Sequence, residues 1–314
     1  MRMLFIFNPH SGRNRARPGL DRRIRDFIAA RALDAGLSVT EGPGHARELA
    51  AAAAAAGAET VVAVGGDGTM NEVAQGLLRT ETALALVPCG SGNGLALHLG
   101  VPRESGLALN LATGIGSRVA EIDTGEADGR PFFNAMGVGI DAEVSRRFNG
   151  LTRRGLSSYA RAAVGCWRRH RPLRCTVEAA GERQTFEALL VAVANSDQYG
   201  NNARIAPGAR TDDGRLDLVV VRQAGLLRTF GLVPRLFLGS LDRSPLVWRR
   251  AGAGFVIERD EPGPLHTDGE THEAGRRVEI RVVRRSLRMV VPAVTSVVAV
   301  RADPVPAGFA LLLP

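Results

Sequence analysis

The stretch Thr60-Val-Val-Ala-Val-Gly65-Gly66-Asp67-Gly68-Thr69-Met70-Asn71-Glu72 decides how the chain is organised. An apolar run typical of a buried strand ends in glycines, and a helical pattern over residues 70–78 follows directly. Glycines let a ligand approach the backbone closely, and the first N–H groups of a helix attract an anion. We expect Thr69 to cap the helix and Asp67 to stand where a divalent metal could bridge it to a phosphate. The stretch therefore predicts a phosphate-binding strand–loop–helix unit.

Two further strands are expected to end in loops of the same kind. Residues 83–87 run into Pro88-Cys89-Gly90-Ser91-Gly92-Asn93-Gly94, where Ser91 and Asn93 offer a hydroxyl and an amide to phosphate, ribose or base. Residues 3–7 run into Asn8-Pro9-His10-Ser11-Gly12. The carboxyl ends of neighbouring parallel strands meet at one edge of a sheet. We therefore expect the three loops to form one phosphate-binding rim.

The pattern of apolar residues divides the chain into two domains. Residues 1–124 alternate strands and helices, which predicts a doubly wound α/β nucleotide domain with a parallel sheet. Residues 125–290 carry closely spaced strands, which predicts an antiparallel β-sandwich interrupted by helices over 156–169 and 226–238. Residues 291–314 are expected to pack back on the first domain.

The amino-acid composition excludes some classes of reaction and favours some classes of partner. The chain has 314 residues, 40 of them basic and 32 acidic, so its formal net charge is +8, and every basic residue is arginine. Without lysine, Schiff-base chemistry and a Walker-type phosphate loop are excluded. The positive charge favours anionic partners. Three cysteines without a CxxC pattern favour a reducing, cytoplasmic compartment, and no stretch has the roughly 20 apolar residues needed to span a bilayer.

A late segment, Leu265-His266-Thr267-Asp268-Gly269-Glu270, places two carboxylates one residue apart. In extended geometry Asp268 and Glu270 would point to the same side and could act together. The alternative is a surface hairpin turn, since Asp-Gly is a frequent turn pair. We read His266 and His272 as solvent-exposed side chains rather than as metal ligands.

Two other patterns are set aside. Residues 137–142 fit the dinucleotide pattern GxGxxA, but the acidic residue expected about 20 positions later is absent. The arginine clusters over 146–154 and 161–174 have few interleaved aromatic residues, so we expect no nucleic-acid partner. These clusters fit either a basic helix at a membrane surface or a solvated helix face.

Taken together, NPxSG, GGDGTxNE, PxGSGN and the late DGE resemble the diacylglycerol kinase catalytic-domain family, which includes bacterial lipid kinases, sphingosine kinases and ceramide kinases. The resemblance runs from residue 5 to about 291, with the motifs in the family's order. It implies a nucleotide domain, a β-sandwich lipid domain and an active site in the cleft between them. It also implies ATP as phosphoryl donor, Mg²⁺, and a membrane lipid alcohol as acceptor. The nucleotide-binding residues expected from the loops and the resemblance are Asn8, Pro9, Ser11, Gly12, Thr40, Gly65, Gly66, Asp67, Gly68, Thr69, Met70, Asn71, Glu72, Gly90, Ser91, Gly92 and Asn93.

The resemblance also implies roles for acidic residues. Asp268 would be the base for the lipid hydroxyl and Glu270 its partner, although family descriptions differ on which of the two is the base. Asp67 and Asp123 would hold the catalytic Mg²⁺ through water. A separate structural metal site would use Asp213 with the backbone carbonyls of Arg210 and Arg215. One departure is Gly94, where many bacterial members have Asp.

Several alternatives stay open at this point. A kinase of a soluble metabolite, similar to NAD kinases, shares GGDGT but does not account for the late DGE. A catalytically inactive nucleotide- or lipid-binding regulator is the other alternative, because of Gly94. The acceptor could be diacylglycerol or a sphingoid or ceramide lipid, held in an apolar pocket of the second domain. We expect peripheral contact with an anionic membrane surface, and an edge of the sandwich could pair two copies into a homodimer.

Overall fold

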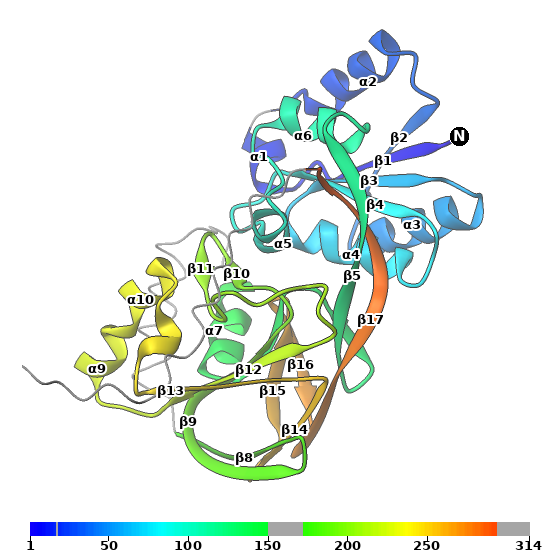
Figure 1. The fold of residues 1–314 in the computed structure, drawn as a ribbon. Coiled ribbons are helices and arrows are strands. Elements are labelled where there is room, and N and C mark those ends of the chain that lie inside the picture. Colours follow the sequence, from blue (N-terminus) through cyan, green and yellow to red (C-terminus); the bar gives the residue numbers. More distant parts are fainter. Residues whose placement is uncertain (17, 150–171, 294–314) are drawn as a thin grey trace, which may run out of the picture.

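A parallel sheet forms the centre of the N-terminal domain, with β2, β1, β3 and β4 side by side in that order. The computed structural model, drawn in Figure 1, describes residues 1–16, 18–149 and 172–293. Every residue of β4 is buried, because helices cover both faces of the sheet. The strands are β1 (Met3–Phe7), β2 (Ala35–Val39), β3 (Thr60–Gly65) and β4 (Ala83–Pro88).

Helices cover this sheet on two sides. On one side Ala50, Val73 and Leu95 pack on Leu84, and on the other Ile24 and its neighbours pack on the opposite face. The helices are α1 (Gly12–Ala16), α2 (Leu20–Ala30), α3 (His45–Ala55), α4 (Asp67–Leu77), α5 (Gly94–His98) and α6 (Ser105–Ala112). The predicted doubly wound α/β domain is therefore confirmed.

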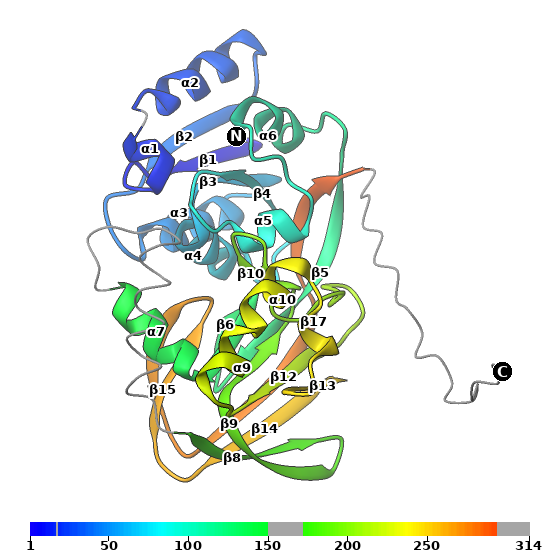
Figure 2. The ribbon, with the colours of Figure 1, turned by 90° about the vertical axis from the view of Figure 1, so that its left-hand side faces the viewer.

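The C-terminal domain is a mostly antiparallel β-sandwich around an apolar interior. Met136, Val177, Val193, Leu218 and Ile257 from five different strands meet there. Helices α7, α9 and α10 lie together on one outer side, as Figure 2 shows. The elements are β6 (Arg130–Phe132), β7 (Ala135–Gly139), α7 (Ile140–Asn149), β8 (Leu173–Ala179), β9 (Glu182–Ala194), β10 (Gln198–Gly200), β11 (Ala203–Arg204), β12 (Leu216–Arg222), α9 (Leu226–Phe230), α10 (Leu232–Leu238), the 3₁₀ helix η1 (Leu241–Arg243), β13 (Val247–Gly252), β14 (Gly254–Arg259), β15 (Gly263–Thr267) and β16 (Glu270–Ala274).

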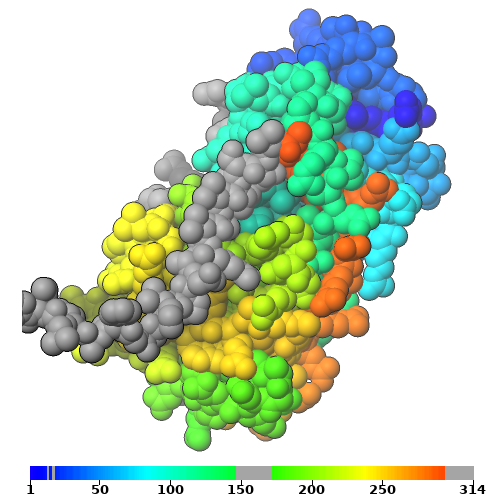
Figure 3. Space-filling view, in the orientation of Figure 1, coloured from blue at the N-terminus to red at the C-terminus, as the bar shows by residue number. Residues whose placement is uncertain are grey.

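Two long strands, β5 (Ser117–Ala127) and β17 (Arg277–Pro292), run through both domains and pair antiparallel. One end of β17 joins β4 of the N-terminal sheet, and the other end joins β14 of the sandwich. In the space-filling view the orange atoms of β17 appear in separate patches that extend from the lower part of the molecule to the upper part (Figure 3). The expected domain boundaries at 124 and 290 therefore fall inside strands that the domains share. Of the segment 291–314, residues 294–314 lie outside the described residues.

Local details differ from the sequence-based expectations. Helix α4 begins at Asp67 with Gly66 as its N-cap, so Thr69 lies inside the helix and is not the cap. The helix expected over 226–238 is two short helices that meet at Gly231. The helix expected over 156–169 lies outside the described residues. No helix in the described part of the chain combines the length and apolar character needed to cross a bilayer.

Gly76 provides a test of the helix packing. A Cβ at this position of α4 would stand 2.5 Å from the carbonyl oxygen of Arg47 and 2.9 Å from the Cβ of Ala50 in α3. We expect Gly76→Ala to lower the free energy of unfolding by about 1–3 kcal/mol in urea titrations, because the neighbouring backbone cannot move aside alone. Gly42→Ala, with nothing within 4 Å, is the control. Equal stability of Gly76→Ala and the wild type would contradict this packing.

Candidate active site

The N-terminal loop is bonded directly to the GGDGT loop. The Asn8 side-chain amide donates to the Thr69 hydroxyl at 2.8 Å, and the Gly66 N–H donates to the Ser11 hydroxyl at 3.2 Å. Thr40 is buried at the end of β2, where its N–H donates to the carbonyl of Phe7. These contacts gather the ends of β1, β2 and β3 at one edge of the sheet.

The Asp67 carboxylate joins the GGDGT loop to the GSGN loop. Its two oxygens accept the N–H groups of Asn93 and Gly94, both at 2.8 Å. A Cβ at Gly92 would stand 2.8 Å from Asp67 Oδ2, so glycine is required for this approach. The expected rim of three loops is therefore present, and Asp67 holds two of them together.

The side chain of Asn93 is bonded within its own loop, and its contact with a ligand stays a prediction. Asn93 adopts a left-handed conformation (φ 53°), and its side-chain amide accepts from the N–H of Gly90 and donates to the Gly90 carbonyl. This amide therefore closes the loop on itself. Ser91 is exposed at the tip of the loop. The other predicted nucleotide-binding residues lie in these loops, at the end of β3 or in the first turns of α1 and α4: Pro9, Gly12, Gly65, Gly68 and Met70.

Asn71 and Glu72 are two of the α4 residues that the sequence predicts to bind the nucleotide. The Oδ1 of Asn71 is buried and has no hydrogen-bond partner in the protein. A buried acceptor of this kind is costly unless a ligand or water donates to it. The Glu72 carboxylate accepts the N–H of Ala46 at 3.1 Å, which fixes it at the start of α3.

The DGE segment is a hairpin turn between β15 and β16. Asp268 (φ 50°) and Gly269 (φ 88°) both have positive φ, as a type I′ turn requires. The expectation that Asp268 and Glu270 share one side of an extended strand is therefore wrong, since Asp268 lies in the turn itself. Its carboxylate accepts the N–H groups of Phe133, Asn134 and Ala135 at 2.7–3.0 Å.

The carboxylates of this turn have altered proton affinities. Burial raises the pKa of Asp268 to about 6, although the three amide donors favour its ionised form. Glu270 as a whole residue is exposed, but its carboxyl group is partly withdrawn from water, and this desolvation together with the charge of Glu72 raises its pKa. Glu72 belongs to α4 and Glu270 to β16, so a carboxylate of the N-terminal domain contributes to the proton affinity of one in the C-terminal domain.

Asn134 lies between the turn and the GSGN loop. Its N–H donates to Asp268, and a Cβ at Gly94 would stand 3.3 Å from its Oδ1. A side chain at position 94 would therefore press on Asn134 and on the N–H of Gly200. The hairpin β10–β11 adds a second link, because the Asn201 N–H donates to the carbonyl of Gly92 at 3.0 Å.

Beneath the turn lies a polar cluster that the sequence analysis missed. His266 is 5% exposed, so the expectation of a solvent-exposed side chain is wrong. Its Nδ1 accepts the N–H of Gly269 at 3.3 Å, which assigns the proton to Nε2, and Nε2 donates to Asp141 at 3.2 Å. The Tyr199 hydroxyl also donates to Asp141, at 3.0 Å. The only sign of this polar cluster in the sequence is the GxG pattern. Its first glycine, Gly137, has no side chain and so leaves room for Asp141 and His266.

Comparison with known proteins identifies the architecture. Residues 2–127 match the model of the diacylglycerol kinase catalytic domain, and residues 134–294 match the YegS C-terminal NAD kinase beta sandwich-like domain. A probable lipid kinase YegS-like of Pseudomonas aeruginosa is 32% identical over 81% of this chain and 84% of its own length.

The chain belongs to the diacylglycerol kinase family of lipid kinases. A diacylglycerol kinase of Bacillus subtilis is 28% identical over 86% of this chain and 89% of its own length. The crystal structure of a putative diacylglycerol kinase from Bacillus anthracis superposes with a TM-score of 0.76 at 25% identity, covering 92% of this chain and 95% of that one. The resemblance inferred from the motifs is thereby confirmed.

The acidic residues expected to hold metal in this lipid kinase have other partners. Both oxygens of Asp123 accept backbone N–H groups, from Gly214 at 2.6 Å and Arg285 at 2.8 Å. Asp213 accepts the N–H of Arg215 at 3.1 Å. Within residues 1–16, 18–149 and 172–293, no three His, Cys, Asp or Glu side chains gather as metal ligands. The metal roles of Asp67, Asp123, Asp213, Arg210 and Arg215 stay predictions.

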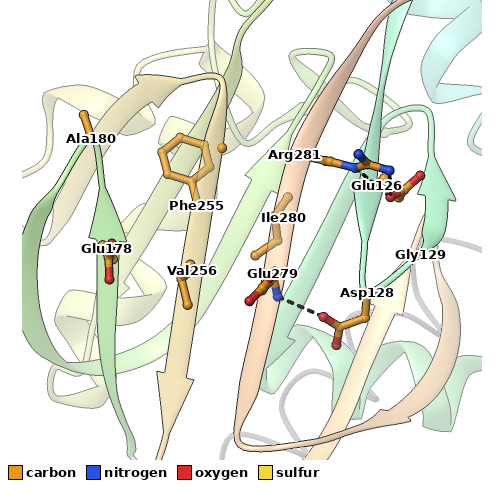
Figure 4. Close-up of a pocket in the computed structure, with 11 residues that line it drawn as sticks. Glu126, Asp128, Gly129, Glu178, Ala180, Phe255, Val256, Glu279, Ile280 and Arg281 are labelled. Carbon is orange, nitrogen blue, oxygen red and sulfur yellow. Dashed lines mark hydrogen bonds and ion pairs between the residues drawn. The ribbon is translucent and has the colours of Figure 1, made fainter.

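A hollow of about 510 Å³ lies on the sandwich of the lipid kinase, away from the three loops (Figure 4). Carboxylates of Glu126, Asp128, Glu178 and Glu279 line it, beside apolar side chains such as Phe255. Arg281 also lines it and pairs with Glu126, so the hollow combines apolar side chains with charges of both signs.

Asp67→Asn tests the bond between the two glycine-rich loops. An amide offers only one acceptor oxygen, so one of the two N–H groups loses its partner. We expect the amides of Asn93 and Gly94 to exchange with deuterium about tenfold faster, the effect of one lost hydrogen bond. Asp26→Asn, an exposed residue of α2, is the control. Wild-type exchange in Asp67→Asn would show that another contact holds the loop.

Proposed function

We propose that this protein transfers the γ-phosphoryl group of Mg²⁺-bound ATP to the hydroxyl of a membrane lipid alcohol, of the diacylglycerol or the sphingoid and ceramide type. The observation that carries the proposal is the position of Asn134. This residue meets the GSGN loop with its side chain and the DGE turn with its N–H. A phosphate held by the loops would thus lie beside the carboxylates of the turn.

The glycine-rich loops fit a nucleotide. Their backbones approach each other closely, and a Cβ at Gly66 would stand 3.1 Å from the Cα of Gly90. Such loops present N–H groups to phosphate oxygens. The unpartnered Asn71 Oδ1 suits a hydroxyl or amine of the nucleotide. Magnesium is expected to arrive with the triphosphate, since it commonly binds one or two carboxylates together with substrate phosphates.

Arginine and backbone take the place of the absent lysine. Arg15 lies in α1, directly after the N-terminal loop, and its N–H donates to the Ser11 carbonyl at 2.9 Å. A guanidinium can bind phosphate oxygens with two hydrogen bonds. We assign to Arg15 and the loop amides the role of neutralising the negative charge on the transferred phosphate.

We assign proton acceptance to Glu270 and turn positioning to Asp268. Three amides engage the Asp268 carboxylate, whereas Glu270 is exposed at the start of β16. Its raised pKa brings it nearer to neutral pH, where a base is most effective. In the reaction the lipid oxygen bonds to the γ-phosphorus, the bond from phosphorus to ADP breaks, and the hydroxyl proton passes to Glu270.

The acceptor lipid implies contact with a membrane. The net charge of +8 favours an anionic surface. We therefore propose a cytoplasmic enzyme that associates peripherally with the membrane.

Substitution of the two carboxylates tests the proposal. We expect Glu270→Gln to lower kcat by about 10²–10⁴, the usual contribution of a general base, and to keep the wild-type melting temperature. Asp268→Asn should lower both kcat and the melting temperature, because one acceptor of the three amides is lost. The measurement is transfer of radiolabelled phosphate from ATP to diacylglycerol, ceramide and sphingosine, with NAD as a parallel acceptor.

The controls for this assay separate the alternatives. Glu273→Gln changes a carboxylate of the same strand outside the turn and should leave turnover unchanged. Label in NAD alone would reject the lipid acceptor, and nucleotide binding without label in any acceptor would identify an inactive regulator.

The Glu72–Glu270 pair predicts a pH effect. The raised pKa of Glu270 means that it takes up a proton at a higher pH than an ordinary Glu, so kcat should fall as the medium becomes acidic. Glu72→Gln removes one cause of the shift, and we expect the acidic limb of the kcat profile to move to lower pH. The variant's amide oxygen can still accept from Ala46. A limb that stays in place would exclude Glu270 as its source.

A further inference from the structure

Helices α9 and α10 carry a group of exposed apolar side chains on the outside of the C-terminal domain. The exposed fractions of Leu226, Leu227, Phe230, Val233 and Leu238 are 45, 88, 43, 47 and 78%. We call these five residues the α9–α10 apolar face. A short helix usually buries such side chains, because packing supplies most of its stability. Only Leu232 of the two helices is fully buried in the domain.

The charged residues within the segment that carries this face are all basic. Residues 223–241 contain no acidic residue and carry two arginines, Arg228 and Arg235. Two nearby carboxylates are already matched, since Asp242 lies 3.9 Å from Arg249 and Asp197 lies 3.7 Å from Arg204. Exposed leucine and phenylalanine together with arginine are typical of helices that lie in the interface of an anionic bilayer.

The position of the face connects it to the active site. Gly239, at the end of α10, packs against the Arg204 side chain of β11, where a Cβ would stand 3.3 Å from Cδ. The β10–β11 hairpin in turn bonds to the GSGN loop through Asn201 and Gly92. Figure 2 shows α10 between this hairpin and α9 on one side of the molecule. If a bilayer lay on this side, only the β10–β11 hairpin would separate α10 from the GSGN loop.

We propose that the α9–α10 apolar face docks the kinase on an anionic membrane. Its leucines and Phe230 enter the headgroup region, while Arg228 and Arg235 contact lipid phosphates. The inference rests on the proposed function only in taking the acceptor to be a membrane lipid. A second copy of the chain would present the same arginines and repel them, which favours the bilayer as the occupant.

The experiment is sedimentation of the full chain with vesicles of phosphatidylcholine mixed with phosphatidylglycerol. We expect the double variant Leu227→Gln, Leu238→Gln to bind at least about tenfold more weakly. Arg228→Gln and Arg235→Gln should each weaken binding about fivefold and reduce its salt dependence. The control is Leu107→Gln, because Leu107 is 56% exposed on α6 of the N-terminal domain. All variants should keep the wild-type melting temperature, since none of these side chains is buried.

The outcomes divide clearly. Weaker binding of the double variant, with wild-type binding of Leu107→Gln, supports the proposal. Equal binding of the double variant and the wild type, or no binding of the wild type to these vesicles, overturns it. Loss of self-association in the double variant without loss of vesicle binding also overturns it and makes the face a dimer surface.

Kinase activity is measured separately, so that the two proposals can fail independently. With a water-soluble short-chain diacylglycerol, the double variant should match the wild type, because the apolar face is outside the catalytic site. With long-chain diacylglycerol in vesicles its rate should fall in parallel with binding. Vesicle binding without phosphorylation of any lipid would contradict the proposed function and leave the docking surface supported.

Discussion

The pair of hydrogen bonds between Asp67 and the GSGN loop is the contact on which the arrangement of the glycine-rich loops depends. One carboxylate at the start of α4 accepts two N–H groups from a loop that follows a different strand. The interaction joins two glycine-rich segments that would otherwise be held only by the sheet behind them. Because a carboxylate has about four acceptor positions, these two hydrogen bonds leave about two of them for a ligand. Asp67 can therefore order the loops and still face the ligand.

The same arrangement recurs at Asp123 and Asp268. Each carboxylate accepts backbone N–H groups of segments far away in the sequence: Asp123 holds the bulge of β17 and the 210–215 loop, and Asp268 holds residues 133–135. Motif reasoning assigns these aspartates to metal binding and proton transfer. Their contacts show that they also set the positions of the loops around the site. A substitution at any of these three aspartates will therefore change both the chemistry and the position of a loop. A substitution at Glu270 tests the chemistry alone, because in the described part of the chain its carboxylate does not hold a loop in place.

The sequence predicted the α/β domain, the sandwich and the rim of three loops, because buried parallel strands and glycine-rich strand ends leave strong local patterns. It missed features that depend on contacts between distant residues. His266 reads as an exposed histidine until the fold places Asp141 and Gly269 around it. From the sequence Thr69 resembles a helix cap, but in the structure its hydroxyl accepts a hydrogen bond from the Asn8 side chain. The DGE turn was ambiguous because Asp-Gly suits both a hairpin and a reactive site.

Strand β17 has a consequence for how the chain is made. It lies next to β4 in the N-terminal sheet, yet it spans residues Arg277–Pro292. The N-terminal domain therefore stays incomplete on the ribosome until the chain has been synthesised as far as β17. During that time the edge of β4 is open to other strands, and open edges promote misassembly. Because β17 pairs with both β4 and β14, it can join the two domains only after it has itself been synthesised.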